Sequence, residues 1–289
     1  MAAGMVKDEN FDLLLHEDGK LEELVGGTIT ERVTIHHWPL SHIQRLTLAN
    51  GQKYIYKAQA GPTVEGKFYA TAESALLVPA RILYDSDGYL CMLLNFIEAP
   101  SLTQLKLSEE QTLSVACDLS REIASIKGDL PALQDLRGPG KWTTFVRETV
   151  GMLDRLVREG RFKSSLGQAI RRTESLAKST PALAAVSGPT GYLHGDFKGD
   201  NILKLPDGYK VIDWTRPLWG PADLDCLNAV ASAGYSPLRH FERGLGMVHA
   251  FLSINWAAQC QLQWFKEGDY EKWVEEGCQR MDRCAEGEW

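Results

Sequence analysis

Three polar residues in one short segment have the types and the spacing that phosphoryl transfer requires. Asp196 stands five positions before Asn201, and a short apolar run leads from Asn201 to a Pro-Asp-Gly turn. A second apolar run follows the turn and ends at Asp213. The two runs, 202–205 and 209–212, predict the strands of a tight hairpin, because Pro-Asp-Gly suits the backbone angles of a turn. Closing that hairpin brings Asn201 and Asp213 side by side.

The oxygens at the open end of this hairpin predict a magnesium site. Mg²⁺ takes few protein oxygens and completes its shell with phosphate. Asn201 and Asp213 would supply those oxygens. Asp196 comes just before them, where it can accept the proton of a hydroxyl that approaches the metal-bound phosphate. The alternative interpretation is a surface hairpin whose acids are only solvated.

The same segment resembles the aminoglycoside phosphotransferase and choline kinase superfamily. Residues 194–201 read His-Gly-Asp-Phe-Lys-Gly-Asp-Asn, similar to the family's His-Gly-Asp, four further residues and Asn. Residues 212–214 read Ile-Asp-Trp, and residues 220–225 resemble the family's Gly-Pro-rich turn before a helix. The resemblance implies that Asp196 is the catalytic acid or base, and it assigns the same two metal ligands.

Three neighbours of this loop have roles that the resemblance suggests. Lys198 is similar to the catalytic-loop lysine of Ser/Thr protein kinases, which touches the γ-phosphate, and we include it among the catalytic residues. A solvated lysine is the alternative. We expect His194 to hold the loop in place rather than to move a proton. We expect Asp225 to accept backbone N–H bonds from the loop.

Composition restricts the class of protein. The 289 residues are 44% hydrophobic and 24% charged, which is ordinary for a globular chain with a real core. A net charge of −7 argues against nonspecific nucleic-acid binding, and no segment fits a membrane span or a signal peptide. The six cysteines are scattered without a Cys-x-x-Cys motif. We therefore expect reduced thiols in a cytoplasmic protein, and the oligomeric state stays open.

The order of predicted elements divides the chain into two lobes. Residues 1–97 alternate in a way that predicts strands, at 31–35, 43–48, 54–58, 81–84 and 90–96, with one helix at 64–77. Residues 98–289 are mainly helical in pattern, at 108–123, 142–157, 162–176 and 245–264. This is the α+β, bilobal protein-kinase-like plan. A small antiparallel β-sheet N-lobe would bind the nucleotide, and a larger, mainly helical C-lobe would carry the catalytic loop and the acceptor site.

The N-lobe contains candidates for nucleotide binding. Lys57 ends a predicted strand and is expected near the α- and β-phosphates. Glu65 resembles the start of the family's first helix and is expected to pair with Lys57, with Glu73 as the rival partner. Residues 93–98, Leu-Leu-Asn-Phe-Ile-Glu, resemble the family's hinge. On that match the carbonyl of Asn95 and the N–H of Ile97 would contact the adenine.

The turn between the first two strands departs from the kinase-like pattern. It is expected at 36–42, with Ser41 near its tip, yet no glycine occurs between Gly27 and Gly51. Backbone N–H groups of ordinary residues would then have to contact the phosphates, which makes close approach harder. The three histidines of this turn suggest a metal cluster as one interpretation. We expect them instead to be loop and strand-edge residues.

These observations predict an ATP- and Mg²⁺-dependent kinase that transfers the γ-phosphoryl group to a hydroxyl of a small acceptor, with GTP as an alternative donor. Residues 266–289 hold eight acids against four Lys and Arg. With Tyr270 and Trp273 among them, they favour a cationic acceptor such as an aminoglycoside, choline or a hydroxy-amine. A solvated helix face is the alternative. A nucleotide-binding pseudokinase with a regulatory role is a second hypothesis. A protein kinase fits less well, because Gly195 replaces the Arg of His-Arg-Asp.

Overall fold

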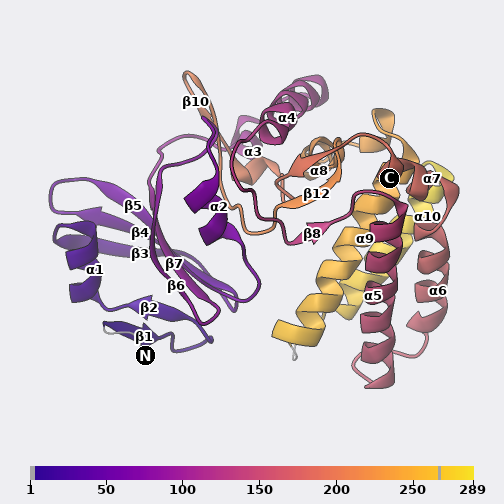
Figure 1. Ribbon diagram of the computed structural model, residues 1–289, viewed down its shortest axis with the longest axis horizontal. Coiled ribbons are helices and arrows are strands. Elements are labelled where there is room, and N and C mark those ends of the chain that lie inside the picture. Colours follow the sequence, from indigo (N-terminus) through magenta and orange to yellow (C-terminus); the bar gives the residue numbers. More distant parts are fainter. Residues whose placement is uncertain (1–3, 266–267) are drawn as a thin grey trace. The chain divides into compact units, whose positions relative to one another are not determined.

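The computed structural model describes residues 4–265 and 268–289, which form two compact units (Figure 1). The first unit comprises Met1–Pro100, Lys127–Leu133 and Leu203–Arg216. The second comprises Ser101–Ile126, Gln134–Ile202 and Pro217–Trp289. Sheets dominate the first unit and helices the second, so the predicted α+β class is confirmed.

The first unit is built around an antiparallel sheet with the strand order β3-β4-β5-β7-β6. The strands β1 and β2 form a separate hairpin, and β10 and β11 form the hairpin that the Pro-Asp-Gly turn predicted. β10 starts at the last residue of a second-unit segment. The elements are β1 Met5–Lys7, β2 Leu14–His16, α1 Asp18–Val25, β3 Ile29–Trp38, β4 Ser41–Leu48, β5 Lys53–Ala60, α2 Glu65–Thr71, β6 Ala80–Ser86, β7 Tyr89–Asn95, β10 Ile202–Leu205 and β11 Gly208–Val211.

Side-chain alternation along β5 separates the two faces of this sheet. Tyr56 and Ala58 are buried in a cluster with Leu13 and other apolar residues of the N-terminal segment. Lys57, between them in the sequence, must point to the opposite face. The N-terminal strands therefore cover one face of the sheet and leave Lys57 on the other.

Two segments of the first unit differ from the predicted elements. The helix expected at 64–77 ends at Thr71, because Ala72 takes an extended backbone and Glu73 then pairs with Lys127 as an isolated bridge. The expected turn at 36–42 is wrong in extent. The strands β3 and β4 pair up to Trp38 and Ser41, which leaves a turn of only two residues.

The second unit is mainly helical and includes a small sheet of strand order β8-β12-β9. Its elements are α3 Leu102–Leu105, α4 Glu109–Ala124, β8 Gln134–Asp135, α5 Pro139–Arg158, α6 Leu166–Ala177, α7 Thr180–Ser187, β9 Thr190–Leu193, the 3₁₀ turn Gly199–Asn201, β12 Leu218–Pro221, α8 Leu224–Ser232, the 3₁₀ turn Pro237–Arg239, α9 Arg243–Gln259, the π-helical turn Cys260–Trp264 and α10 Glu271–Glu286. Among the described residues, no helix is both long and apolar enough to cross a bilayer.

The core of the second unit lies among α5, α6, α9 and α10, which run alongside one another (Figure 1). Trp142 of α5 is fully buried there, and its indole N–H donates to the carbonyl of Ala177 at 2.7 Å. Ser108 caps α4: its hydroxyl accepts the N–H of Gln111, and the Gln111 side chain accepts the N–H of Ser108. Capping of this kind satisfies amides that the helix itself leaves unpaired.

The cysteines differ in part from the expectation of reduced thiols. Cys117 of α4 and Cys226 of α8 form a disulfide, with their Cα atoms 5.3 Å apart. The prediction was wrong for this pair, because the two residues are 109 positions apart in the sequence and only the packing of α4 on α8 brings them together. The remaining cysteines are buried thiols.

Candidate active site

A buried ion-pair group lies on the face of the first unit's sheet that carries Lys57. The Nζ atom of Lys57 is 2.7 Å from Oε2 of Glu65 and 2.7 Å from Oδ1 of Asp213. The predicted pair of Lys57 and Glu65 is therefore confirmed. The rival Glu73 is exposed and pairs through its backbone with Lys127. The contact with Asp213 was not predicted as an ion pair, and it brings a predicted metal ligand to the predicted phosphate-binding lysine.

Burial and charge act in opposite directions on these groups. Burial by itself would lower the pKa of Lys57, but the carboxylates of Asp213 and Glu65 outweigh it and raise that pKa. Burial raises the pKa of Glu65, and the ammonium of Lys57 only partly offsets it. Lys57 is therefore fully charged near neutral pH. Glu65 is completely buried, whereas the side chain of Asp213 is 35% exposed, so Asp213 is the carboxylate that a ligand can reach.

The backbone at Asp213 is strained, and the residue after it holds it in place. Asp213 has φ +68°, a left-handed conformation that costs a non-glycine residue about 1–3 kcal/mol. Trp214 is fully buried, stacks on Phe68 of α2 with ring centroids 4.3 Å apart, and donates its indole N–H to the carbonyl of Val211 at 3.0 Å. These contacts fix the direction of the Asp213 side chain. The sequence drew attention to Trp214 only as part of a motif and gave no sign of its partner in α2.

An apolar surface of partly exposed side chains adjoins Lys57 on this face. Ile55 lies two positions before Lys57 in β5 and therefore shares its face. With Ile97 and Ile212 it packs against a buried cluster that consists of Val78 and the β7 residues Leu90, Met92 and Leu94. These three isoleucines are partly buried, and such a surface suits a flat, apolar ring system.

The predicted hinge residues lie at the end of β7. Asn95 is the last residue of that strand, and its N–H donates to the carbonyl of Pro79 at 3.0 Å. The N–H of Ile97 has no hydrogen-bond partner that we find within residues 4–265 and 268–289. A backbone donor beside an apolar surface is what the hinge prediction requires.

Ser41 lies on the same face of the sheet as Lys57. It pairs with Gln59 in β5, and Ile43, two residues on, pairs with Lys57. The Ser41 side chain is buried, and its hydroxyl accepts the indole N–H of Trp38 at 2.6 Å. That bond holds Ser41 within the hairpin, so any contact with phosphate would come from the short turn rather than from a long mobile loop.

The second unit brings Asp196, Lys198 and Asn201 together in one loop. The Nζ atom of Lys198 is 3.0 Å from Oδ2 of Asp196. The amide Nδ2 of Asn201 donates to the carbonyl of Asp196 at 2.8 Å and lies 3.4 Å from its Oδ2. The amide nitrogen of Asn201 is thus used within the loop, which leaves its Oδ1 as the atom suited to a metal. Asn201 belongs to the second unit and Asp213 to the first, so their shared metal stays a prediction.

The backbone of this loop is held by a buried carboxylate. Asp225 at the start of α8 accepts the N–H of His194 at 2.6 Å and the N–H of Gly195 at 3.1 Å, which confirms its predicted role. Gly195 has φ +79°, a conformation that favours glycine. The ring of His194 is buried and its Nδ1 accepts the N–H of Asp196 at 3.3 Å, in line with the predicted structural role. Burial raises the pKa of Asp225 to about 7, although the two N–H bonds oppose it.

His249 of α9 is a candidate functional residue that the sequence analysis missed. Its Nε2 is 3.1 Å from Oδ1 of Asn228, and its buried Nδ1 has no hydrogen-bond partner within the described part of the chain. Burial and, to a smaller extent, the charge of Arg280 lower the pKa of His249, the charge of Asp196 opposes them, and the net result is a pKa of about 4. His249 is therefore neutral near pH 7 and close enough to Asp196 to feel its charge. A lone histidine in an apolar helix gave no sequence signal for this arrangement.

The comparison with family models identifies the class of protein. Residues 62–270 match the model of the phosphotransferase enzyme family, well over half of the chain. The chain belongs to this family and is a phosphotransferase. A search of curated proteins found no match.

Similar solved structures share the kinase-like fold. A thermostable mutant of the aminoglycoside phosphotransferase APH(4)-Ia has a TM-score of 0.60 and 15% identity, over 93% of this chain and 98% of that one. A choline/ethanolamine kinase family protein from Mesorhizobium loti has a TM-score of 0.60 and 12% identity, over 93% and 92%. The streptomycin–ATP ternary complex of APH(2")-IIa has a TM-score of 0.57 and 16% identity, over 95% and 100%. At these identities the likeness shows the fold alone, and the predicted fold is confirmed.

Proposed function

We propose that this phosphotransferase transfers the γ-phosphoryl group of ATP to a hydroxyl of a small molecule, with Mg²⁺ as the metal. One observation carries the proposal: a buried lysine is held by a buried glutamate and contacts a reachable aspartate, in a chain of the phosphotransferase family. A solvated surface hairpin would not need a buried lysine between two carboxylates, because burying charge is costly unless a partner compensates it.

Features of the first unit favour the proposal that it binds the nucleotide. The ammonium of Lys57, fixed by Glu65, would bind the α- and β-phosphates. The surface of Ile55, Ile97 and Ile212 would take the base, and the backbone at Asn95 and Ile97 would form its hydrogen bonds. ATP is present in a complex of the same fold, which favours it as the donor, with GTP as the alternative.

We propose Asn201 of the second unit and Asp213 of the first unit as the protein ligands of the magnesium ion. Both supply oxygen, the ligand that hard cations prefer, and Asp213 is partly exposed. When bound, the ion would neutralise phosphate charge. Within the chain, the bond from Asn201 to the Asp196 carbonyl keeps its amide oxygen directed away from the loop.

Asp196 would act as the base for the acceptor hydroxyl. Its Oδ2 is 3.0 Å from Lys198, so a positive charge lies beside the point at which the hydroxyl proton is taken up. His194 and Asp225 hold the loop through backbone hydrogen bonds and would keep the Asp196 carboxylate in one position. Asp196 and Lys198 are the residues we propose to be catalytic.

The acceptor is proposed to bind the second unit near Asp196. His249 is neutral and hydrogen-bonded to Asn228, and its buried Nδ1 has no partner within the described residues, so an acceptor would have to reach into the second unit to donate a hydrogen bond to it. In the C-terminal segment, Tyr270 and Trp273 lie with ring centroids 5.7 Å apart and Trp273 is 57% exposed, which is a reason to test cationic acceptors but places no acceptor beside Asp196.

The acids of the C-terminal segment contribute less to that acceptor site than their number suggested. Ion pairs link Glu271 to Lys163, Asp282 to Arg172 and Glu276 to Lys272. These three acids fit the alternative of a solvated helix face. Residues 266 and 267 of the same segment lie outside the described residues.

The proposal is tested by a screen for ADP release with ATP, Mg²⁺ and a panel of amino sugars, choline-like alcohols and hydroxy-amines. We expect turnover with at least one acceptor, loss of that turnover in Asp196→Asn, and a phosphate ester of the acceptor in ³¹P NMR spectra. ATP binding without phosphoryl transfer to any acceptor in the panel would favour the pseudokinase hypothesis. Absence of nucleotide binding would contradict both.

A further inference from the structure

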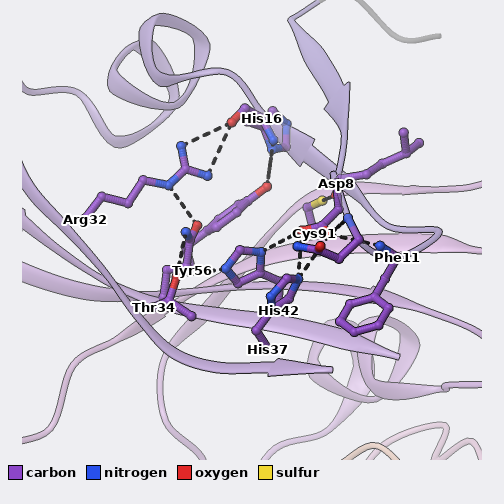
Figure 2. A network of polar contacts seen from close by, with 12 residues as sticks. Asp8, Phe11, His16, Arg32, Thr34, His37, His42, Tyr56 and Cys91 are labelled. Carbon is purple, nitrogen blue, oxygen red and sulfur yellow. Dashed lines mark hydrogen bonds and ion pairs between the residues drawn. The ribbon is translucent and has the colours of Figure 1, made fainter. Parts of the chain in front are cut away.

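One carboxylate and two imidazoles meet in the first unit, away from the proposed active site (Figure 2). Asp8, His37 and His42 each offer a ligand atom, and these atoms all lie within 4.8 Å of one another. The Oδ2 atom of Asp8 is 3.0 Å from Nε2 of His37 and 3.1 Å from Nδ1 of His42. We propose that this cluster is a binding site for a divalent transition-metal ion of the zinc type.

The β3–β4 hairpin fixes the two histidines relative to each other. His37 and His42 are directly opposite in the hairpin, next to the closing pair of Trp38 and Ser41. Their rings stack with centroids 4.2 Å apart and an interplanar angle of 28°. Asp8 reaches the same point from the segment between β1 and β2, where its side chain is only 6% exposed. Two ligands next to the turn of a hairpin and a third from a separate segment form a preorganised site.

The hydrogen-bond partners of His42 and Asp8 are of the kind that metal ligands usually have in proteins. A metal-bound histidine usually donates its other ring N–H to an acceptor, and a ligating carboxylate is itself hydrogen-bonded. Nε2 of His42 lies 3.0 Å from the hydroxyl of Thr34 (Figure 2). Oδ1 of Asp8 accepts the backbone N–H groups of Asn10 at 2.9 Å and Phe11 at 3.1 Å. Oδ1 thus anchors Asp8 and also lies 3.1 Å from Nε2 of His37, while Oδ2 faces both imidazoles.

Binding of an ion would draw the three ligand atoms, which lie within 4.8 Å of one another, to the spacing of a zinc site. Zinc–nitrogen and zinc–oxygen bonds of about 2.0–2.1 Å place neighbouring ligand atoms of a tetrahedral site roughly 3.3 Å apart. The Asp8 oxygen is already 3.0–3.1 Å from both ring nitrogens. As a metal ligand, each imidazole binds through the ring nitrogen that faces the ion and carries a proton on the other ring nitrogen. Three protein ligands leave one position for water.

The site is separate from the phosphate-binding face of the sheet. His42 pairs with Ala58 in β5, whereas Lys57 pairs with Ile43, and successive residues of a strand point to opposite faces. A bound ion would therefore link the N-terminal segment to the face of the β3–β4 hairpin opposite to the one that carries Ser41. We expect the ion to stabilise the first unit without taking part in phosphoryl transfer.

The proposal is tested by titrating Zn²⁺ into the metal-free full-length protein, without a histidine tag, against a competing chelator. We expect one ion per chain and a rise in unfolding temperature with zinc. Asp8→Asn, His37→Ala and His42→Ala should each weaken binding by on the order of 100-fold or more, and Thr34→Val by about 10-fold. His36→Ala is the matched control, because this exposed histidine precedes His37 on the same strand, and its affinity should equal that of the unsubstituted protein. Equal affinity in Asp8→Asn and in the unsubstituted protein would overturn the proposal.

A second measurement needs no substitution and covers the case in which a variant fails to fold. In ¹H–¹⁵N spectra of histidine-labelled protein, one equivalent of Zn²⁺ should move the His42 proton from Nδ1 to Nε2 and shift the His37 resonances. Unchanged His37 and His42 signals in the presence of bound zinc would place the ion elsewhere. Absence of zinc binding would mean that Asp8, His37 and His42 form only a hydrogen-bonded cluster. Unchanged histidine signals or absence of zinc binding would each reject the proposed site.

Discussion

Asp196 is the residue on which the proposed chemistry depends most directly. Asp196→Asn removes the proton acceptor and keeps the shape of the side chain. We expect the variant to lower kcat by about 10²–10⁴ while the ATP dissociation constant changes little, because the carboxylate acts on the acceptor hydroxyl. Asp200→Asn, at an exposed position of the same loop, is the control and should keep normal kcat. A kcat within a few-fold of normal for Asp196→Asn would remove Asp196 from its role.

Lys57 is expected to contribute nucleotide affinity through a charged hydrogen bond. Lys57→Ala would also leave the carboxylates of Glu65 and Asp213 without their shared cation. Loss of such a bond is worth roughly 1.5–3 kcal/mol, or about a 10- to 150-fold weaker binding of ATP with Mg²⁺. Calorimetric titration measures this. Lys67→Ala, an exposed lysine two residues after Glu65, should bind ATP normally. Normal affinity in Lys57→Ala would contradict the assignment.

The raised pKa of Asp225 predicts how the free energy of unfolding changes with pH. Burial raises its pKa from the ordinary 3.8 to about 7 in the folded chain, so the folded state binds more protons than the unfolded state between these values. The free energy of unfolding should therefore fall as the pH rises from about 4 to about 7, by on the order of 2–4 kcal/mol, and then level off. Urea unfolding at several pH values, compared with Asp225→Asn, isolates this effect. A wild-type curve parallel to that of the variant would show that Asp225 does not titrate in this range.

At the scale of elements, the sequence predicted those strands and turns that depend on local patterns of residues. The hairpin of β10 and β11 followed from its turn, and β5 from its alternation, because both signals are local. The early end of α2 could not be predicted, because the bridge between Glu73 and Lys127 joins segments far apart in the sequence. The contact of Lys57 with Asp213 and the gathering of Asp8 with His37 and His42 depend on packing in the same way.

The packing of α2 against Trp214 is a contact between elements that a substitution can test. Trp214 is fully buried and stacks on Phe68, so Trp214→Ala should destabilise the first unit by roughly 3–5 kcal/mol. ATP affinity should fall as well, because the strained backbone at Asp213 loses its anchor. Urea unfolding followed by circular dichroism gives the free energy. Trp273→Ala, at an exposed tryptophan, should change it by no more than about 0.5 kcal/mol. Equal effects of the two substitutions would mean that Trp214 is no anchor.

At the scale of the whole molecule, neither unit is one continuous piece of chain. The first unit takes Leu203–Arg216 from the middle of the second unit's sequence, and with it Asp213 and Trp214. The sequence pattern predicted a boundary near residue 97, where strands give way to helices, but not this return of the chain, because a hairpin has the same local pattern in either unit. The disulfide between Cys117 and Cys226 likewise joins two segments of the second unit that are far apart in the sequence.

This arrangement predicts that residues 1–100 do not form the first unit by themselves. The fragment lacks Trp214, so Phe68, which is fully buried in the full chain, loses the ring stacked on it, and Lys57 loses one of its two carboxylates. We expect the fragment to unfold without a cooperative transition and to show no ATP binding by calorimetry. A peptide of residues 200–216 added in trans should restore part of the structure, and the fluorescence of its Trp214 should shift to shorter wavelength as the ring is buried. The same peptide with Trp214→Ala is the control and should have no effect. A fragment 1–100 that unfolds cooperatively and binds ATP unaided would show that the first unit does not need this segment.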